Sequence, residues 1–417
     1  MREKMFADTQ VASLLQQRVP DHALPRPFYT DGEVYDLDLR TVWYRDWLFA
    51  IPSCEIPKTG NFVTLQVGDY AVVIVRGADG VVRAFHNACR HRGSRVCTAA
   101  RGNAPKLVCP YHQWTYELDG RLLYARDMGP EFDASKHGLK PVACEDVGGM
   151  VFICLSDNPP AIESFVETAR RYLAPHRLDQ AKVAFESTIV EKGNWKLVLE
   201  NNRECYHCAG AHPELCRTYP DRPGFTSVDE NGAIEPAMTA HWQKCEAAGL
   251  PSEFVIDPSH QWRFSRIPLL GAGESYTMDG KAAVPNKRLS SAPFADAGSL
   301  LFFHYPNSWN HFLADHSIVF RVLPIGPTES EVTTKWLVHK DAVEGVDYDL
   351  TNLTRVWVAT NDEDRQVVEE NQKGINSPAF EPGPYSRIQE DGVIQFVDWY
   401  CRTLGDRVGG GARLAAE

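Results

Sequence analysis

The sequence has 417 residues, a length that predicts two or three domains with a sizeable buried core. Lys and Arg number 43 against 55 Asp and Glu, and the net charge of −12 argues against nucleic acid as a partner, because binding to phosphates needs clustered basic side chains. The first ten residues lack the apolar core of a secretory signal, and no apolar run approaches the roughly 18 residues of a membrane span. We therefore expect a cytoplasmic protein that makes no membrane contact.

The N-terminal part of the chain reads as one helix followed by short strands. Apolar residues at helical spacing predict an amphipathic helix over about residues 33–48. Runs of Val, Ile and Phe between Gly-Asp turns then predict an antiparallel β domain over residues 45–160, which ends at an Asn-Pro-Pro breaker. We expect the segment 1–44 to pack with the C-terminal domain. The strands are predicted at residues 62–67, 70–76, 81–85, 107–109, 114–118 and 150–155.

The C-terminal part, residues 161–417, mixes helices and strands and indicates an α+β domain. Segments 218–236 and 270–297 are rich in Gly, Pro, Ser and Asp without periodicity, so we expect loops there. The elements are predicted as helices at residues 161–173, 194–209, 348–372 and 393–404, and as strands at residues 184–191, 299–305, 316–323 and 331–339.

Cysteine and histidine are plentiful, and the first cluster of them lies in the β domain. Eleven cysteines, an odd number in a chain without an export signal, argue against a disulfide framework. Cys89 and His91 are followed, after seventeen residues, by Cys109 and His112. Zinc takes the same ligand types, but its knuckles commonly pair Cys with Cys and His with His. Mixed loops let one iron of a [2Fe–2S] cluster take both cysteines and the other both histidines, so we predict a Rieske centre, with zinc as the alternative.

The second cluster lies on the predicted helix that begins at Asn194. His207 and His212 are five positions apart, more than one helical turn, and they converge if the helix loosens near Gly210. Two neutral imidazoles and one carboxylate form the facial triad of mononuclear non-haem Fe(II), which leaves coordination positions open for dioxygen. A structural histidine pair is the alternative interpretation.

Cys205 and Cys208 lie among these histidines in a Cys-x₂-Cys pattern. Such a pattern is typical of a redox or zinc pair. Small buried hydrophobic side chains are the other interpretation, and it is the one we favour.

The two clusters, in this order, make the chain similar to the α-subunits of Rieske non-haem iron oxygenases. The similarity rests on residues 89–94 (CRHRGS), 109–120 (CPYHQWTYELDG) and 194–196 (NWK). It implies an antiparallel β Rieske domain followed by a helix-on-antiparallel-sheet, helix-grip-like catalytic domain. High-potential Rieske proteins carry a further cysteine in each loop, where this chain has Ser94 and Tyr111, so the resemblance implies an unbridged cluster of the lower-potential type.

The resemblance assigns the carboxylate ligand to a late helix. In the family, an aspartate on this helix is followed by a glutamate a little over one turn later, and residues 361–369 (NDEDRQVVE) fit this pattern. We assign Asp364 as the ligand. Asp362 is the alternative, because spacing alone does not separate them, and without the family context a solvated acidic helix face would be preferred.

Glu204 matches the acid that connects the two metal sites of this family across a subunit interface. The resemblance places its carboxylate between a Rieske histidine of one subunit, here His112, and an iron histidine of the next, here His207, where it orients both rings. This implies a ring, most simply a homotrimer. Most aromatic-ring dioxygenases have Asp at this position, whereas Glu resembles the subgroup that acts on quaternary ammonium compounds.

The subgroup implies an enzyme that N-demethylates a betaine. Its members attack glycine betaine, proline betaine or carnitine with O₂ and release formaldehyde, and the similarity is greatest to the first two. The chain has no nucleotide fingerprint and no second four-cysteine ferredoxin motif, so a separate NAD(P)H-dependent reductase with flavin and a [2Fe–2S] centre is the expected partner. An aromatic-ring oxygenase and a Rieske electron carrier with a degenerate second site are the alternatives.

Recognition of a quaternary ammonium rests on aromatic faces, because this cation donates no hydrogen bond. The C-terminal domain offers several aromatic residues near the predicted strands. The substrate candidates are Trp262, Tyr276, Phe303, Tyr305 and Trp309.

Overall fold

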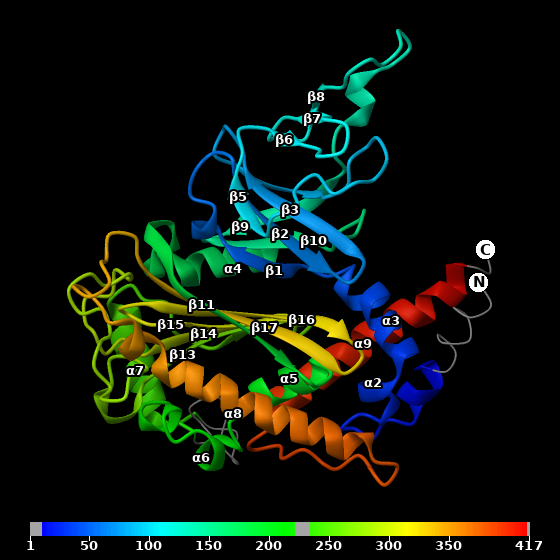
Figure 1. The fold of residues 1–417 in the computed structure, drawn as a ribbon. Coiled ribbons are helices and arrows are strands. Elements are labelled where there is room, and N and C mark those ends of the chain that lie inside the picture. The colour runs from blue at the N-terminus through cyan, green and yellow to red at the C-terminus, as the bar shows by residue number, and fades with distance from the viewer. Residues whose placement is uncertain (1–10, 222–233, 415–417) are drawn as a thin grey trace. The chain divides into compact units, whose positions relative to one another are not determined.

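The computed structural model of the protein describes residues 11–221 and 234–414, so most of the predicted loop 218–236 lies outside the described residues. The chain divides into two compact units (Figure 1): Trp43–Ile162 form one, and the segments before and after it together form the other. Both units are built on antiparallel sheets, and the described α-helices belong to the larger unit, which confirms the predicted α+β class. Within the described residues, every helix is too short or too polar to cross a bilayer.

The unit Trp43–Ile162 contains strands β1 (Leu48–Pro52), β2 (Asn61–Val67), β3 (Tyr70–Arg76), β4 (Val82–His86), β5 (Arg101–Asn103), β6 (Leu107–Val108), β7 (Thr115–Tyr116), β8 (Leu122–Tyr124), β9 (Pro141–Val147) and β10 (Met150–Cys154). The larger sheet has the order β1-β10-β9-β4-β3-β2-β5, and β6-β7-β8 form a separate small sheet. Trp114, just before β7, and Tyr116 of β7 belong to the same apolar core as Cys89 and Cys109, so the two predicted cysteine ligands are part of a packed core.

The other unit is built on a seven-stranded sheet of order β11-β17-β16-β15-β14-β13-β12. These strands are β11 (Ala181–Glu191), β12 (Val255–Ile256), β13 (Trp262–Ile267), β14 (Ser299–His304), β15 (Ser308–Phe312), β16 (Ser317–Gly326) and β17 (Glu329–His339). The described helices are α2 (Pro27–Thr30), α3 (Gly32–Asp38), α4 (Glu163–Leu173), α5 (Trp195–Asn202), α6 (Cys208–Ala211), α7 (Pro236–Ala247), α8 (Leu350–Asn376) and α9 (Asp391–Leu414).

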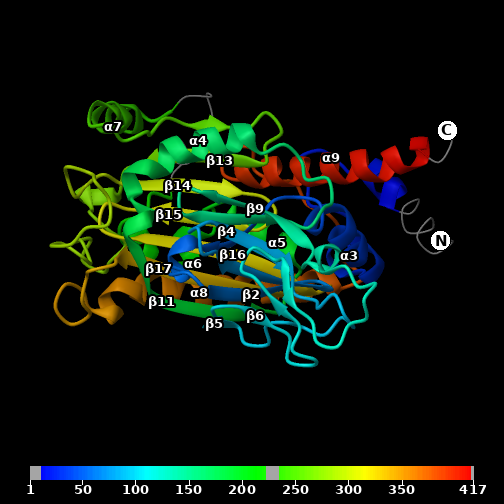
Figure 2. The same ribbon diagram turned by 90° about the horizontal axis from the view of Figure 1, so that it is seen from above.

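The two faces of this sheet carry different helices, and the strand pleat assigns each side chain to one face. Phe302 of β14 stacks on Phe165 of α4 with ring centroids 5.7 Å apart, on the face that Figure 2 shows covered by α4. Its neighbour Phe303 points to the opposite face, where the guanidinium of Arg203 lies over its ring. That face carries α5 and α8 (Figure 1), and Phe303 shares one cavity there with the candidate iron residues His207, His212 and Asp364.

Helix α5 is fixed at its start by hydrogen bonds to distant elements. The Asn194 side chain caps the helix by accepting from the backbone N–H of Lys196. Lys196 is fully buried and pairs with Asp38 of α3, which also accepts from the Trp195 indole N–H at 3.1 Å and from the Tyr400 hydroxyl of α9 at 2.6 Å. A buried charge needs such complete pairing, and here it holds three helices in one arrangement.

Several predicted elements differ from the observed ones. The helix expected over residues 33–48 ends at Asp38, continues as a π-helical turn to Trp43, and gives way to strand β1 at Leu48. The helix expected over residues 194–209 is interrupted after Asn202 and resumes only as the single turn α6. Strands β1, β5, β8, β9, β12, β13 and β15 and helices α2 and α7 were not predicted; most of these sequences are short or polar and carry little periodicity.

Candidate metal centres

The two cysteine loops of the smaller unit share one backbone geometry. In each, the residue four positions after the cysteine donates its N–H to the cysteine carbonyl: Gly93 to Cys89 and Gln113 to Cys109, both at 3.0 Å. Both of these residues have positive φ, 78° at Gly93 and 62° at Gln113. A left-handed residue closes each turn, so the loops are two copies of the same tight hairpin tip.

The four predicted ligands are brought together, with the cysteines inside and the histidines outside. Cys89 and Cys109 are buried, 5% and 1% exposed, whereas His91 and His112 are exposed. The Nδ1 atoms of the two imidazoles face each other at 3.2 Å. This donor set fits a [2Fe–2S] cluster whose inner iron takes two thiolates and whose outer iron takes two imidazoles.

Aromatic side chains hold the exposed imidazoles. Trp114 stacks on His91 with ring centroids 5.0 Å apart, and Tyr111 stacks on His112 at 3.8 Å. Below them, the Tyr116 hydroxyl lies 3.2 Å from Sγ of Cys89 and accepts from the Arg90 N–H at 3.0 Å, which leaves its own hydrogen to point at the sulfur.

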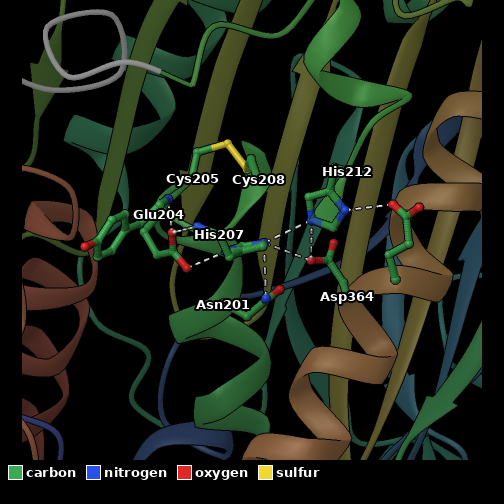
Figure 3. The surroundings of a disulfide bond; sticks show 9 residues. Asn201, Glu204, Cys205, His207, Cys208, His212 and Asp364 are labelled. Carbon is green, nitrogen blue, oxygen red and sulfur yellow. Dashed lines mark hydrogen bonds and ion pairs between the residues drawn. A yellow bond between two sulfur atoms is a disulfide. The ribbon is translucent and has the colours of Figure 1, made fainter. Parts of the chain in front are cut away.

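The second predicted cluster is assembled by the break in the helix after α5. His207 is the residue before α6 and His212 is the residue after it, so the two imidazoles lie at opposite ends of a single turn. Asp364 projects toward them from the middle of the long helix α8 (Figure 3). The loosening predicted near Gly210 is located instead in residues 203–207.

Three donor atoms converge on one point. Nε2 of His207 and Nε2 of His212 lie 3.0 Å apart, and Oδ1 of Asp364 lies 3.3 Å from the first and 3.0 Å from the second (Figure 3). Donor atoms at right angles around a metal with bonds of about 2.1 Å lie about 3.0 Å apart. The spacing therefore fits a facial set of three ligands on one metal ion.

Each imidazole is oriented by a second carboxylate on its other nitrogen. Oε1 of Glu204 lies 2.5 Å from Nδ1 of His207, and Oε2 of Glu363 lies 2.8 Å from Nδ1 of His212. This pattern fixes the ring orientation and leaves Nε2 free for a metal. Sequence reasoning singled out Glu204 but missed Glu363, which stands beside Asp364 in an acidic run where spacing alone gives it no distinct role.

The charges around the two imidazoles favour a cation between them. Burial opposes protonation, but hydrogen bonds to Asp364 and Glu204 raise the pKa of His207 to about 9. Burial likewise opposes ionisation of Asp364, yet the two imidazoles hold the pKa of this carboxyl below its ordinary value. Three carboxylates around two imidazoles are the environment that a divalent metal ion would neutralise.

The alternative ligand Asp362 points elsewhere. Its carboxylate is half exposed and pairs with Arg365 at 3.1 Å on the same helix. Because Asp362 and Asp364 are two positions apart on α8, they face directions about 200° apart. Of these two aspartates, only Asp364 lies beside the histidines.

Cys205 and Cys208 form a disulfide that encloses His207 (Figure 3). This corrects the interpretation of the pair as two separate hydrophobic side chains. The bond joins the residue after Glu204 to the first residue of α6, so the loop that carries His207 is covalently closed.

A cavity that is partly open to solvent adjoins the three converging donors. Four of the five aromatic substrate candidates, Trp262, Tyr276, Tyr305 and Trp309, are absent from the described lining, whereas Phe303 belongs to it. The lining residues are Asn201, Asn202, Glu204, Cys205, His207, Cys208, His212, Leu215, Tyr219, Phe303, His311, Trp357, Thr360 and Asp364.

The position of Trp262 shows why a predicted substrate residue can lie outside the cavity lining. Trp262 pairs with His304 across β13 and β14, and its ring lies 5.9 Å from Phe165 of α4. It therefore lies on the face of the sheet opposite to Phe303. The aromatic residues that sequence reasoning missed are Tyr219, His311 and Trp357, none of which stands in a recognisable motif.

Two family profiles match the chain. Residues 46–143 match the Rieske [2Fe-2S] domain, and residues 178–406 match the ring hydroxylating alpha subunit (catalytic domain). The second match covers more than half of the chain and contains both histidines and Asp364 of the convergent site.

Curated relatives extend the similarity over the full length. The glycine betaine monooxygenase oxygenase subunit of Chromohalobacter salexigens is 52% identical over 401 residues, which are 95% of this chain and 89% of that protein. The subunit of the same name from Pseudomonas aeruginosa is 49% identical over 399 residues, 95% of this chain and 92% of that protein. A carnitine monooxygenase oxygenase subunit of Acinetobacter baumannii is 33% identical over 58% of this chain and 64% of that protein.

Solved structures share the fold. A quaternary ammonium Rieske monooxygenase in complex with an inhibitor superposes with a TM-score of 0.71 at 22% identity and covers 94% of this chain and 98% of its own. Naphthalene 1,2-dioxygenase from Rhodococcus superposes with a TM-score of 0.70 at 18% identity, over 95% of this chain and 98% of its own.

Proposed function

The chain belongs to the family of Rieske oxygenase α-subunits, and on this premise we propose that it is the oxygenase component of a monooxygenase that removes an N-methyl group from a betaine. The enzyme is an oxidoreductase whose cofactors are a Rieske [2Fe–2S] cluster and a mononuclear iron. Cys89, His91, Cys109 and His112 would hold the cluster. His207, His212 and Asp364 would hold the iron.

The observation that carries the proposal is the cavity beside the convergent donors. Its wall combines the aromatic faces of Tyr219, Phe303 and Trp357 with the carboxylates of Glu204 and Asp364. Aromatic faces and nearby negative charge are what a quaternary ammonium group binds. Burial lowers the pKa of His311 to about 3, so this lining imidazole is neutral and does not repel a cation.

The preferred substrate is glycine betaine, in keeping with relatives of that name about 50% identical to this chain. Proline betaine, whose ring the cavity must admit, is the second candidate. The bound iron supplies dioxygen activation, which a methyl C–H without an acidic proton requires. With two electrons from the reductase and two protons, one oxygen atom of O₂ would enter the C–H bond and the other would leave as water. The N-hydroxymethyl group would then break its C–N bond to give formaldehyde, dimethylglycine and a proton.

The chain's own residues position the reaction. Glu204 and Glu363 orient His207 and His212, which fixes the position of the iron relative to the cavity. The electrons come from a reductase, because the chain is an oxygenase subunit of a multicomponent system. We propose an NAD(P)H-dependent reductase with flavin and a [2Fe–2S] centre.

We further propose that the oxygenase works as a cytoplasmic homotrimer in which Glu204 connects His207 to His112 of the next subunit. The support is that Glu204 already binds one of these two rings, at 2.5 Å. Carboxylates in this role hold both imidazoles in orientation. A Glu204→Gln variant is expected to keep both metals and to slow turnover, and a monomer at micromolar concentration in mass photometry would contradict the trimer.

The proposed activity is tested with the purified holoprotein, an NADH-linked reductase and O₂. We expect formaldehyde and dimethylglycine in equal amounts from glycine betaine, and about three irons per chain. Benzoate and naphthalene serve as probes of the aromatic-ring alternative. Turnover of these and not of betaines would contradict the proposal, and about two irons per chain would favour an electron carrier.

A further inference from the structure

Two buried arginines contact a residue that lines the candidate substrate cavity, Phe303, although neither arginine belongs to the described lining itself. Arg203 is 4% exposed and stands between Asn202 and Glu204, which both line the cavity. Arg263 on β13 is 7% exposed and pairs with Phe303, another lining residue, across the strands. The two guanidinium carbons lie 4.0 Å and 5.1 Å from the centre of the Phe303 ring.

The positive charge of this pair is not balanced within the described residues. Neither guanidinium forms an ion pair with a carboxylate there. Arg203 donates from Nε to the Tyr305 hydroxyl, but its two terminal nitrogens, Nη1 and Nη2, are buried and have no described hydrogen-bond partner. Among the described residues, Arg263 donates to the Gln395 side chain, at 3.3 Å. Burying a charge without a partner is costly, so such a pair is the expected feature of a site for an anion.

Two neighbouring features show how the charge of this pair is placed. Burial, followed by the charge of Arg203, lowers the pKa of Arg263 to about 10. The first turn of α9 also packs against Arg203: a Cβ added to Gly392 would lie 2.9 Å from Nη2 and closer still to the Arg203 carbonyl. A helix N-terminus carries a partial positive charge. Asp391 in this turn favours the charged form of Arg263, but it forms no ion pair with it.

We infer that Arg203, supported by Arg263, binds the carboxylate of the zwitterionic substrate. The inference rests on the proposed function and adds to it the group that distinguishes a betaine from other quaternary ammonium compounds. Two unpartnered terminal nitrogens on one planar guanidinium match the two oxygens of a carboxylate. The ammonium group then lies toward the aromatic and acidic wall, and the carboxylate fixes which end of the molecule faces the iron ligands.

The test compares glycine betaine with its neutral carboxamide, which has the same trimethylammonium group and nearly the same shape. Binding to the holoprotein is measured anaerobically by calorimetry, so that no turnover occurs. We expect the wild type to prefer glycine betaine, and Arg203→Met to weaken glycine betaine binding about 10- to 100-fold while changing carboxamide binding less than threefold. Arg203→Lys keeps the positive charge but loses the two parallel donors of the guanidinium. Its affinity for glycine betaine is expected to lie between those of the wild type and Arg203→Met.

Arg266→Met is the matched control, because Arg266 is also buried but donates to His176 and Ser252 on the opposite face of the sheet. This variant is expected to keep the ratio of the two affinities. If Arg203→Met lost affinity equally for both ligands, or kept its affinity for glycine betaine, the inference would be overturned while the proposed function would stand. A wild-type protein that neither binds nor demethylates any betaine would overturn the proposed function and the inference together.

Discussion

The carboxylate of Glu363 lies 2.8 Å from Nδ1 of His212, while Nε2 of the same ring lies 3.0 Å from Asp364. One imidazole is therefore held between two carboxylates from adjacent positions of α8. Glu363 sets the orientation of the ring, and Asp364 lies on the side of the ring where a metal would bind. His207 is held in the same manner between Glu204 and Asp364, so the site has an orienting carboxylate for each imidazole.

We predict that Glu363→Gln weakens binding of Fe(II) about 10- to 100-fold, because the orienting hydrogen bond to His212 loses its charge. The measurement is competition with a chelator of known affinity, and the cluster absorbance should stay unchanged. Asp362→Asn is the control, since this neighbouring acid pairs with Arg365 at the surface. Equal iron affinity in the two variants would contradict the assigned role of Glu363.

The metal ligands of both centres could be predicted from the sequence more completely than the residues that surround them. Cys89, His91, Cys109 and His112 stand in a spacing that one cofactor explains, and the structure brings all four together. The choice between Asp364 and Asp362 depends on the direction in which each side chain leaves α8. That direction is set by how the helix packs, which the sequence alone does not show.

The aromatic wall could not be predicted, because its members depend on strand parity and on loops. Strands β13 and β15 have polar, mixed sequences, so their pleat was unknown and Trp262 could not be assigned to the α4 face. Trp309 pairs with Phe303 on the cavity face but stacks on Phe320 and lies outside the described lining. Tyr219 comes from a loop without periodicity.

We predict that Tyr116→Phe lowers the reduction potential of the cluster. The Tyr116 hydroxyl lies 3.2 Å from Sγ of Cys89, and burial together with this contact raises the pKa of the tyrosine, so it remains a donor. A hydrogen bond to a ligating sulfur stabilises the reduced, more negative state. A bond of about 1 kcal/mol corresponds to roughly 40 mV for one electron.

Protein-film voltammetry of the oxygenase provides the measurement of this potential. Tyr124→Phe is the control, because Tyr124 is an exposed tyrosine of the same small sheet and should leave the potential in place. The same potential in Tyr116→Phe and the wild type would show that the hydroxyl does not reach the sulfur in the loaded protein.

The Cys205–Cys208 disulfide predicts a specific thiol count. The other nine cysteines are not disulfide-bonded, so the denatured, metal-free protein should titrate nine thiols without reductant and all eleven after reduction. The Cys208→Ser variant should titrate ten thiols in both conditions, since 11 − 1 = 10. Opening this short loop is expected to lower the free energy of unfolding by up to about 2 kcal/mol. Eleven thiols in the unreduced wild type would contradict the bond.

His176 predicts a loss of stability in acid. Its Nε2 accepts a hydrogen bond from Arg266 at 3.1 Å, which requires a neutral ring, and burial together with the charge of Arg266 holds the pKa of His176 well below its ordinary value. The unfolded chain takes up a proton here below about pH 6.5, and the folded protein does not. The stability contributed by the neutral ring is therefore complete above pH 6.5 and is lost as the pH falls, by up to about 1.4 kcal/mol for each pH unit.

We expect the thermal midpoint of the wild type to drop between pH 7.5 and pH 5.5, and the drop to be smaller in His176→Asn, which keeps an acceptor for Arg266 but does not titrate. Scanning calorimetry of the holoprotein at both pH values gives the two midpoints, and His22→Asn, at a partly exposed histidine, serves as the control. An equal drop in all three proteins would mean that the acid sensitivity has another origin. If the drop in thermal midpoint is smaller in His176→Asn and not in His22→Asn, the acid sensitivity belongs to the buried ring. Of the two substitutions, only His176→Asn removes a group whose protonation is suppressed in the folded protein.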